Sequence, residues 1–425
     1  MLQSFFPWRH EYPSTAHGLA RALAAYTRVW FVSKPPTWKD ALRQRDLGRL
    51  FAQPRVERVA LPRLGGPTDA TTDAGVPFGK TEPAQRAGSL HVVKLAATPP
   101  INGLAPGSAA YERLRGFADR RMSRQLASVL RGAGTESPLW INLYAPTQLL
   151  DLGDIPAPAR RLYYTVDAIG EADYTARHGV SAEVAQARRA DLVLATSARL
   201  AEHARERLRA TGVERRVEVV PNAVDAELYL TPQRYPEPDD LADIPHPRAV
   251  YVGNLDAARI DFELLERLAR ERPDLHLVLV GPVNAAQTVV DRALALPNVH
   301  ALGRKDQRAC PAYLQHVDLG LIPFRLTDLT AAIYPLKINE YLAIGKPVLA
   351  TPFSKDIADF RDNITLAPID QWAGLIEEVV EAHTPERAAA NVRRGADNDW
   401  ASRARTFLGL AGYAVEAAPV ETPVA

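Results

Sequence analysis

Short runs of apolar residues alternate with longer amphipathic stretches along most of the chain. The first half holds apolar runs at 29–33, 90–95, 139–144, 161–166, 190–196 and 217–222, and helical patterns at 15–26, 109–130, 181–190 and 197–210. Runs rich in β-branched and aromatic residues are typical of buried strands, whereas apolar residues three and four apart are typical of helices. Strands that alternate with helices predict an α/β protein with parallel, doubly wound sheets.

The alternation is interrupted once and then restarts. Residues 231–247 are rich in proline and acidic residues, so we expect them to form no core element and to lead into a second domain. Beyond them, apolar runs at 248–255, 275–282, 299–303, 319–324 and 347–351 alternate with helical patterns at 260–273, 310–317 and 335–345. A chain of 425 residues is also too long for one comfortable core. We therefore predict two facing α/β domains with ligands bound beyond the carboxyl ends of their strands.

The cysteine content and the N-terminus bear on the compartment. Cys310 is the single cysteine, which excludes a disulfide within the chain and favours a reducing compartment. No apolar run approaches 18 residues, and the first fifteen residues lack the pattern of a secretory signal. We expect a cytoplasmic protein.

Residues 333–351 hold the strongest group of candidate functional residues. Pro335 suits the first turn of a helix, which Gly345 would end. Lys337 and Glu340, three residues apart, would share one helical face. A helix N-terminus beside a lysine favours a diphosphate, and a glutamate one turn further on can accept hydrogen bonds from a ribose diol. The alternative is an ordinary Lys–Glu pair on the protein surface.

The order and spacing of these residues resemble the donor-site helix of nucleotide-sugar glycosyltransferases of the GT-B fold. The similarity is greatest to the family 4-like group, also called group 1, and within it to bacterial teichuronic-acid and polysaccharide-type transferases. Further segments resemble other motifs of these enzymes in the same order, at residues 12–15, 29–40, 219–225, 251–265, 301–324 and 399–410.

The resemblance implies two Rossmann-like domains with a C-terminal helix that crosses back to the first. The acceptor-side domain would comprise residues 1–228 together with the helix at 399–418. The donor domain would comprise residues 229–398. The boundaries follow the linker motif at 219–225 and the final helix.

Several residues receive roles in donor binding from the resemblance. Gly253 and Asn254 would form the glycine loop under the diphosphate, since a glycine after a strand lets backbone approach phosphate closely. Arg259 would join Lys337 in neutralising the leaving diphosphate. The donor set is completed by Gly303, Arg304, Tyr334, Pro335 and Glu340. The alternatives are a solvated Arg259 at the start of a helix and an Arg304 whose side chain has no role.

On the acceptor side, Asp167 follows a predicted strand and could orient the acceptor hydroxyl or act as a base. Tyr12, Ser14 and Thr15 would line the acceptor side in the first loop. The alternative for Asp167, Ser14 and Thr15 is the capping of a neighbouring helix or turn.

One residue departs from the family pattern. The group usually carries two glutamates eight positions apart, of which Glu340 is the second, and the first position holds Ala332. In the family that earlier glutamate contacts hydroxyls of the donor sugar, so the sugar and the expected retention of configuration are both put in question. Asp328 is a possible substitute.

The expected activity is the transfer of a hexose from a UDP- or GDP-type nucleotide diphospho-sugar to the hydroxyl of a sugar, lipid-linked or small-molecule acceptor. We expect no metal and no other cofactor, because no Cys/His cluster has zinc spacing and the dinucleotide fingerprint is missing. Asp397 and Asp399 form an Asp-x-Asp that helix capping suffices to explain. Two alternatives stay open, a sugar-nucleotide epimerase of the same fold and a non-catalytic two-lobed protein that binds nucleotide sugars.

The charge is divided unevenly along the chain. Residues 1–131 hold 20 Lys and Arg against 9 Asp and Glu, a net charge of +11, whereas the remainder holds 31 against 41, a net charge of −10. We expect no nucleic-acid partner. The basic segment, which includes a helix with six arginines, favours an acidic or lipid-phosphate acceptor or peripheral contact with an anionic membrane surface at the inner face of the membrane. A merely solvated arginine-rich face is the alternative.

Overall fold

The structure is a computed structural model that describes residues 1–5, 7–8, 14–60, 88–171, 173–230, 234–284 and 288–414. The chain divides into two compact units. Unit 1 comprises Met1–Ala195, Leu200–Val220 and Ala404–Ala425, and unit 2 comprises Thr196–Arg199 and Pro221–Arg403. The predicted boundary between the two domains, between residues 228 and 229, stays a prediction.

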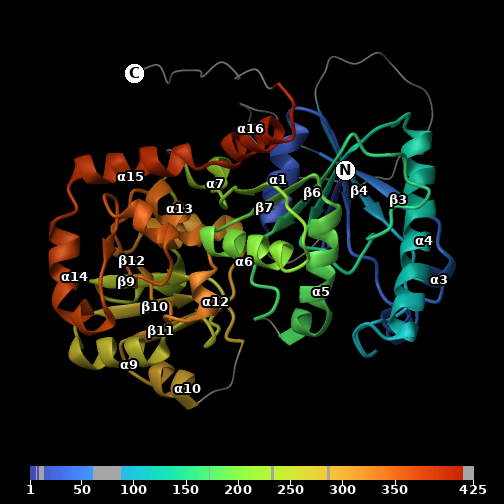
Figure 1. Cartoon of the computed structure of the whole chain (residues 1–425). Helices are drawn as coiled ribbons and strands as arrows, with labels where there is room; N and C mark the ends of the chain where they lie inside the picture. The colour runs from blue at the N-terminus through green and yellow to red at the C-terminus, as the bar shows by residue number, and fades with distance from the viewer. Residues whose placement is uncertain are drawn as a thin grey trace. The chain divides into compact units, whose positions relative to one another are not determined.

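Unit 1 is built on a sheet of eight strands in the order β3-β4-β2-β1-β5-β6-β7-β8, and every neighbouring pair is parallel except β3 with β4. The strands are β1 Leu2–Ser4, β2 Arg28–Val32, β3 Arg55–Val59, β4 Ser89–Lys94, β5 Leu139–Leu143, β6 Arg160–Thr165, β7 Leu192–Ala195 and β8 Val217–Val219. The helices are α1 Thr15–Ala24, α2 Trp38–Arg43, α3 Gly48–Phe51, α4 Ala109–Gly132, α5 Asp173–Arg189 and α6 Ala198–Arg209 (Figure 1).

Unit 2 is built on a parallel sheet of six strands in the order β11-β10-β9-β12-β13-β14. The strands are β9 Arg248–Val252, β10 His276–Val280, β11 Val299–Gly303, β12 Leu319–Ile322, β13 Val348–Ala350 and β14 Thr365–Leu366. The helices are α7 Ala226–Tyr229, α8 Asp239–Ala242, α9 Phe262–Glu271, α10 Thr288–Leu294, α11 Cys310–Gln315, α12 Asp328–Ala331, α13 Leu336–Ala343, α14 Trp372–Glu381 and α15 Pro385–Asp397, with short 3-10 turns at Gln307–Ala309, Asp356–Phe360 and Ile369–Gln371. Two parallel-sheet units confirm the predicted α/β class.

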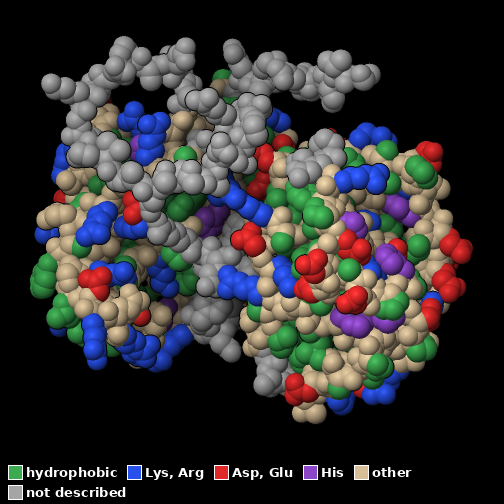
Figure 2. Space-filling model, turned by 180° about the vertical axis from the view of Figure 1, so that it is seen from behind, with side chains coloured by type: hydrophobic (Ala, Val, Ile, Leu, Met, Phe, Trp, Pro, Cys, Tyr) green, Lys and Arg blue, Asp and Glu red, His purple; other side chains and the backbone are tan. Residues whose placement is uncertain are grey.

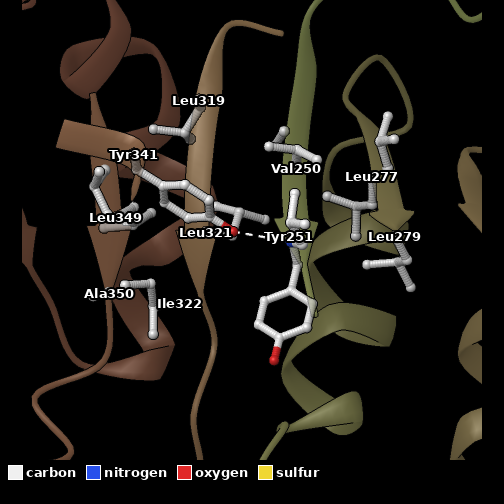
Figure 3. Close-up of a cluster of buried hydrophobic side chains, with 14 of the residues drawn as sticks. Val250, Tyr251, Leu277, Leu279, Leu319, Leu321, Ile322, Tyr341, Leu349 and Ala350 are labelled. Atoms are coloured by element: carbon white, nitrogen blue, oxygen red, sulfur yellow. Dashed lines mark hydrogen bonds between the residues drawn. The ribbon is translucent and has the colours of Figure 1, made fainter. Parts of the chain in front are cut away.

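The core of unit 2 explains why its strands are almost wholly apolar. Side chains on both faces of a parallel sheet are covered, so the strands carry continuous apolar runs. Helix α13 contributes Tyr341, whose ring lies among Leu319, Leu321 and Leu349 (Figure 3). The Tyr341 hydroxyl accepts a hydrogen bond of 2.9 Å from the backbone N–H of Val252. This contact fixes α13 against the end of β9, where the candidate site lies.

The expectation that residues 231–247 form no core element is wrong for part of that segment. Its short helix α8 places Leu241, fully buried, in the core of unit 2, and Ile244 follows it there. The buried guanidinium of Arg248 donates to the carbonyl of Ile244 at 2.6 Å and to the carboxylate of Glu237. Two apolar residues among acids and prolines are sufficient to anchor this segment in the core, because its charged side chains remain at the surface.

The last helix, α16 Trp400–Leu410, continues into unit 1. Its Phe407 ring lies 5.6 Å from the ring of Tyr164 on β6, and the guanidinium of Arg160 donates to the carbonyl of Leu410 at 3.1 Å. Asp399 caps the start of this helix by accepting a hydrogen bond from the N–H of Ser402 at 2.7 Å. Within the described ranges, none of the helices is long and apolar enough to cross a membrane.

Candidate functional site

Helix α13 begins at Leu336, one residue later than predicted, and Pro335 occupies the position before it. Pro335 offers no side-chain hydrogen bond to the first turn, so the N–H groups of that turn receive no side-chain cap from it. A helix N-terminus left open in this way attracts anions. Lys337, in the first turn, is half-buried and adds a full positive charge there.

The side chain of Lys337 lies over Gly253, the first residue after β9. A Cβ at Gly253 would stand 2.3 Å from Cε and 2.7 Å from Nζ of Lys337, and the φ of Gly253 is +148°, which other residues rarely adopt. The Lys337 ammonium is 5.3 Å from the ring centroid of Tyr251 and donates a hydrogen bond to its hydroxyl. The Tyr251 ring points away from the packed leucines of the core (Figure 3). Glycine is therefore required where the lysine crosses the backbone.

Three neighbouring strands end in glycines with positive φ. Besides Gly253, these are Gly281 after β10, with a φ of +151°, and Gly303 at the end of β11, with a φ of +68°. The N–H of Gly281 donates to the carbonyl of Gly303, and a Cβ at Gly281 would stand 1.8 Å from the carbonyl oxygen of Gly253. Backbone without side chains at the carboxyl edge of a parallel sheet lets a phosphate or a base approach the main chain closely.

Arg259 and Asn254 lie in the segment between β9 and α9. The Arg259 guanidinium forms a half-buried ion pair of 3.3 Å with Asp256, and its charge acts on the Tyr251 phenol together with that of Lys337. Burial raises the pKa of Tyr251, whereas both cations oppose that shift. The side-chain oxygen of Asn254 is buried and has no hydrogen-bond partner among the described residues. The carbonyl of Asn254 accepts a hydrogen bond of 3.3 Å from the Tyr251 hydroxyl, so Lys337, Arg259 and Asn254 gather around one tyrosine.

Glu340 does not form the surface pair that its spacing from Lys337 allowed. Its carboxylate accepts a hydrogen bond from the buried phenol of Tyr229 on α7, while the Lys337 side chain turns toward Tyr251. Burial raises the pKa of Glu340, and the charge of Lys337 and the hydrogen bond from Tyr229 act against that shift. A half-buried carboxylate held at a fixed place is suited to binding hydroxyl groups.

The segment before α13 is held by its backbone. The carbonyl of Ala332 accepts a hydrogen bond of 2.7 Å from the hydroxyl of Ser197, and the carbonyl of Tyr334 accepts one of 2.9 Å from Asn222. Ala332 is 1% exposed. Asp328, the possible substitute for a glutamate at that position, is 80% exposed in its side chain and lies 3.8 Å from Arg199.

The acceptor-side candidates lie in unit 1. Asp167 follows β6 and is half-buried, and its carbonyl lies 3.5 Å from the hydroxyl of Thr165. Ser14 precedes α1, and its hydroxyl is 2.8 Å from Nδ1 of His17 in the first turn, which supports the capping alternative. Thr15 is buried. Tyr12 lies outside the described residues.

Arg304 and Cys310 are two further residues of unit 2 that the sequence singles out. Arg304 is exposed beyond β11, so its side chain gains no support from burial. Cys310 is buried, which raises the pKa of its thiol to about 12. Throughout the described part of the chain, no group of three or more His, Cys, Asp and Glu side chains could hold a metal ion.

Sequence reasoning missed the two tyrosines, Tyr229 and Tyr251, that hold Glu340 and Lys337, because they lie about a hundred residues upstream of their partners. It also missed Gly281, although the sequence Val-Gly-Pro after an apolar run repeats the Val-Gly-Asn around Gly253. That repetition is the signal that would have found it.

Comparison with known proteins relates the segment that carries this site to a family. Residues 246–384, which carry all the donor-side candidates, match the family model described as glycosyl transferases group 1. It is 30% identical over 172 residues to the putative teichuronic acid biosynthesis glycosyltransferase TuaH of Bacillus subtilis (strain 168). That match covers 40% of this chain and 43% of TuaH, so it spans less than half of either protein.

Solved structures resemble the whole fold. Sucrose-phosphate synthase from Thermosynechococcus elongatus matches with a TM-score of 0.62 at 16% identity over 97% of both chains. HepE from Anabaena, in complex with UDP and glucose, matches with a TM-score of 0.57 at 15% identity over 97% of this chain and 99% of that one. At such low identity the likeness concerns the fold, and it confirms the predicted GT-B architecture.

Proposed function

We propose that this chain, whose second unit carries the match to group 1 glycosyl transferases, transfers a hexose from a UDP- or GDP-type nucleotide diphospho-sugar to an acceptor hydroxyl. The observation that carries the proposal is the position of the Lys337 ammonium over Gly253, beside the uncapped start of α13. A diphosphate bound there meets a cation and the N–H groups of a helix N-terminus at once. The family match over residues 246–384 supports the same conclusion.

In this mechanism the leaving diphosphate gains negative charge as the glycosidic bond breaks. Lys337 and Arg259 stabilise that charge, because cations fixed in place before the reaction need no reorganisation. Loss of one such group commonly costs about 3–4 kcal/mol of barrier, or about 10²–10³ in rate. Glu340 binds the ribose and so fixes the anomeric carbon. The backbone at Gly303 and Arg304 contacts the base, and Asn254 and Tyr334 complete the donor contacts.

Two finer statements belong to the proposal. Transfer proceeds with retention of configuration, as the resemblance implies, and without a catalytic metal, since the protein's own cations serve the diphosphate. Activity that survives chelation and a product of the donor's anomeric configuration would support these statements. Loss of activity on chelation with recovery on adding a divalent cation would overturn the second.

The acceptor is a hydroxyl of a glycan, a lipid-linked sugar or a small molecule. Asp167, at the carboxyl end of β6, orients this hydroxyl, and Tyr12, Ser14 and Thr15 line the acceptor side. The basic unit 1 suits an acceptor that carries phosphate or lies at an anionic membrane surface.

The first experiment is a thermal-shift panel of nucleotides and nucleotide sugars, because a donor at a hundred times its Kd stabilises the folded state by about 2.7 kcal/mol. The second compares Lys337→Ala and Glu340→Ala in a transfer assay with Arg393→Ala, an exposed arginine on α15, as the control. We expect each site variant to lose at least tenfold in turnover and the control to lose none. Unchanged turnover in both site variants would refute the assignment.

The assay also separates the alternatives. A product formed from the donor alone, with an inverted ring carbon, would identify an epimerase. Tight nucleotide-sugar binding by calorimetry without transfer or hydrolysis to any acceptor would identify a non-catalytic binding protein.

A further inference from the structure

Most of the large apolar side chains that the described residues of unit 1 expose lie in one region, with Val219 and Tyr413 outside it. Leu42 is 60% exposed, Leu47 56% and Phe51 83%, all within α2, α3 and the turn between them. Phe117 on α4 is a further exposed aromatic residue. Single exposed apolar residues are common, but a group of them on one surface marks an interaction site.

Contacts hold α2, α3 and α4 together as one surface. The guanidinium of Arg121 on α4 donates to the carbonyl of Leu50 on α3. The ring of Trp38 on α2 is 6.1 Å from that of Phe117. The backbone of Arg49 accepts a hydrogen bond from the N–H of Ala97, which follows β4. The apolar residues therefore share a rigid support.

Basic residues surround these apolar side chains. We call the surface the α2–α4 patch and define it by Leu42, Leu47, Phe51 and Phe117 together with the exposed basic residues Lys39, Arg43, Arg45, Arg49, Arg113, Arg120 and Arg124. Residues 38–51 and 109–132 hold ten basic and four acidic residues, a net charge of +6. The view of unit 1 in Figure 2 shows blue side chains in several places, with green apolar ones beside them at its edge.

The turn between α2 and α3 keeps an arginine where a glycine would fit better. Arg45 has a φ of +53°, and its N–H and that of Asp46 donate to the carbonyls of Leu42 and Ala41 in the pattern that usually ends a helix at glycine. A left-handed arginine is less stable than glycine by about 1 kcal/mol. Arginine at this position adds a positive charge beside Leu47 at the tip of the turn.

We propose that the α2–α4 patch docks unit 1 on an anionic phospholipid membrane. Leucine and phenylalanine side chains enter the boundary between headgroups and acyl chains, while the surrounding arginines remain among the phosphates. A second copy of this chain is a poorer occupant, because a symmetric contact would place two surfaces of net charge +6 against each other. A bilayer satisfies both the apolar and the cationic parts of the patch.

The position of the patch links it to the acceptor side of the proposed function. Thr37, beyond β2, pairs with Thr98, beyond β4, so α2 lies at the carboxyl edge of the sheet. Asp167, beyond β6, lies at the same edge of the sheet. Strand β6 is three strand spacings, or roughly 15 Å, from β2, which leads into α2. Docking thus brings a lipid-borne hydroxyl to the acceptor edge. This last step rests on the proposed function, whereas docking itself does not.

Vesicle sedimentation with the full chain tests the docking. We expect binding to phosphatidylcholine vesicles that contain 30% phosphatidylglycerol, no binding to pure phosphatidylcholine, and binding that falls as salt rises from about 0.05 to 0.5 M. Replacing Arg43, Arg45 and Arg49 together with Gln should weaken binding on the order of 100-fold, at about fivefold per charge. The double variant Leu47→Ser, Phe51→Ser should reduce the part of vesicle binding that persists at high salt.

Matched controls remove the same charge or the same kind of side chain elsewhere on unit 1. The charge control replaces Arg177, Arg188 and Arg209 with Gln, and the apolar control is Tyr413→Ser, which is exposed beyond α16. Controls that lose as much binding as the patch variants would overturn the proposal. So would equal binding to neutral vesicles, no binding at all, or a salt-resistant dimer that Phe51→Ser dissociates. No sugar donor enters this assay, so its outcome is separable from that of the transfer assay.

Discussion

Gly253→Ala is the substitution that most directly examines the candidate site. The new methyl group would stand 2.3 Å from Cε of Lys337, 2.7 Å from its Nζ and 3.2 Å from the hydroxyl of Tyr251. All three atoms belong to side chains, and the lysine end is flexible. We therefore expect the lysine to move away while the fold persists, so that the diphosphate loses its cation without any change at residue 337 itself.

Two magnitudes follow for Gly253→Ala. An alanine held at a φ of +148° is strained by about 1–3 kcal/mol, which is the expected loss in the free energy of unfolding. Displacement of Lys337 should lower turnover by about 10²–10³, as for removal of an electrostatic group. Gly212→Ala is the matched control, because its φ is +69° but nothing lies within 4 Å of the added methyl group. The control should lose about 1 kcal/mol of stability and no turnover, since Gly212 belongs to no part of the candidate site.

A double-mutant cycle in the transfer assay decides whether the lysine is the cause. If Gly253→Ala acts by displacing Lys337, then Gly253→Ala combined with Lys337→Ala should be no slower than Lys337→Ala alone. Fully additive losses in the double variant would refute this reasoning. So would a Gly253→Ala protein that unfolds cooperatively with wild-type stability and retains wild-type turnover.

Three further predictions concern other groups. Glu340→Gln should lower turnover at least tenfold but stabilise the free protein increasingly above pH 4.5. Burial raises the folded pKa of Glu340 above 4.5, so the stabilising contribution of the protonated carboxyl is lost as pH rises through that pKa. Urea midpoints at pH 4 and pH 8 would check this. Cys310, with a pKa raised to about 12, should react with iodoacetamide at pH 8 roughly a thousandfold or more slowly when folded than in urea, as thiol titration would measure. Arg45→Gly should raise the free energy of unfolding by about 0.5–1 kcal/mol and weaken vesicle binding. Equal changes in the urea midpoint at both pH values would contradict the prediction for Glu340→Gln. Rapid alkylation of Cys310 in the folded protein would contradict the second prediction, and a destabilised Arg45→Gly protein would contradict the third.

The repeating elements could be predicted because each carries its own pattern. The apolar runs that follow the first residue of β9 and of β10, for example, need both faces covered, and that requirement is local to each strand. The strand β1 was missed, since Leu2–Ser4 is only three residues long and shows no alternation. Its place between β2 and β5 is decided by pairing with residues far along the chain. Short segments of this kind are assigned by their partners and not by their own composition.

The site shows the same division between local and distant information. The spacing of Lys337 and Glu340 placed them on one helix, but it could not reveal that Tyr251 and Tyr229 draw them in different directions. Those tyrosines come from a strand end and a short helix, and only the folded chain brings them to α13. For Ser14 the local pattern was sufficient, because the contact with His17 spans three residues.

Ala332 separates two roles that one segment has to fill. In the proposed function the segment must place the start of α13 correctly, and it must leave room for the donor sugar. The first role needs no side chain at this position, because the carbonyls of Ala332 and Tyr334 are held by Ser197 and Asn222. A residue 1% exposed also leaves little space for a carboxylate. The helix, and with it Lys337, can therefore keep its position while the sugar contacts change, so we expect nucleotide selectivity to follow the family and sugar selectivity to depart from it.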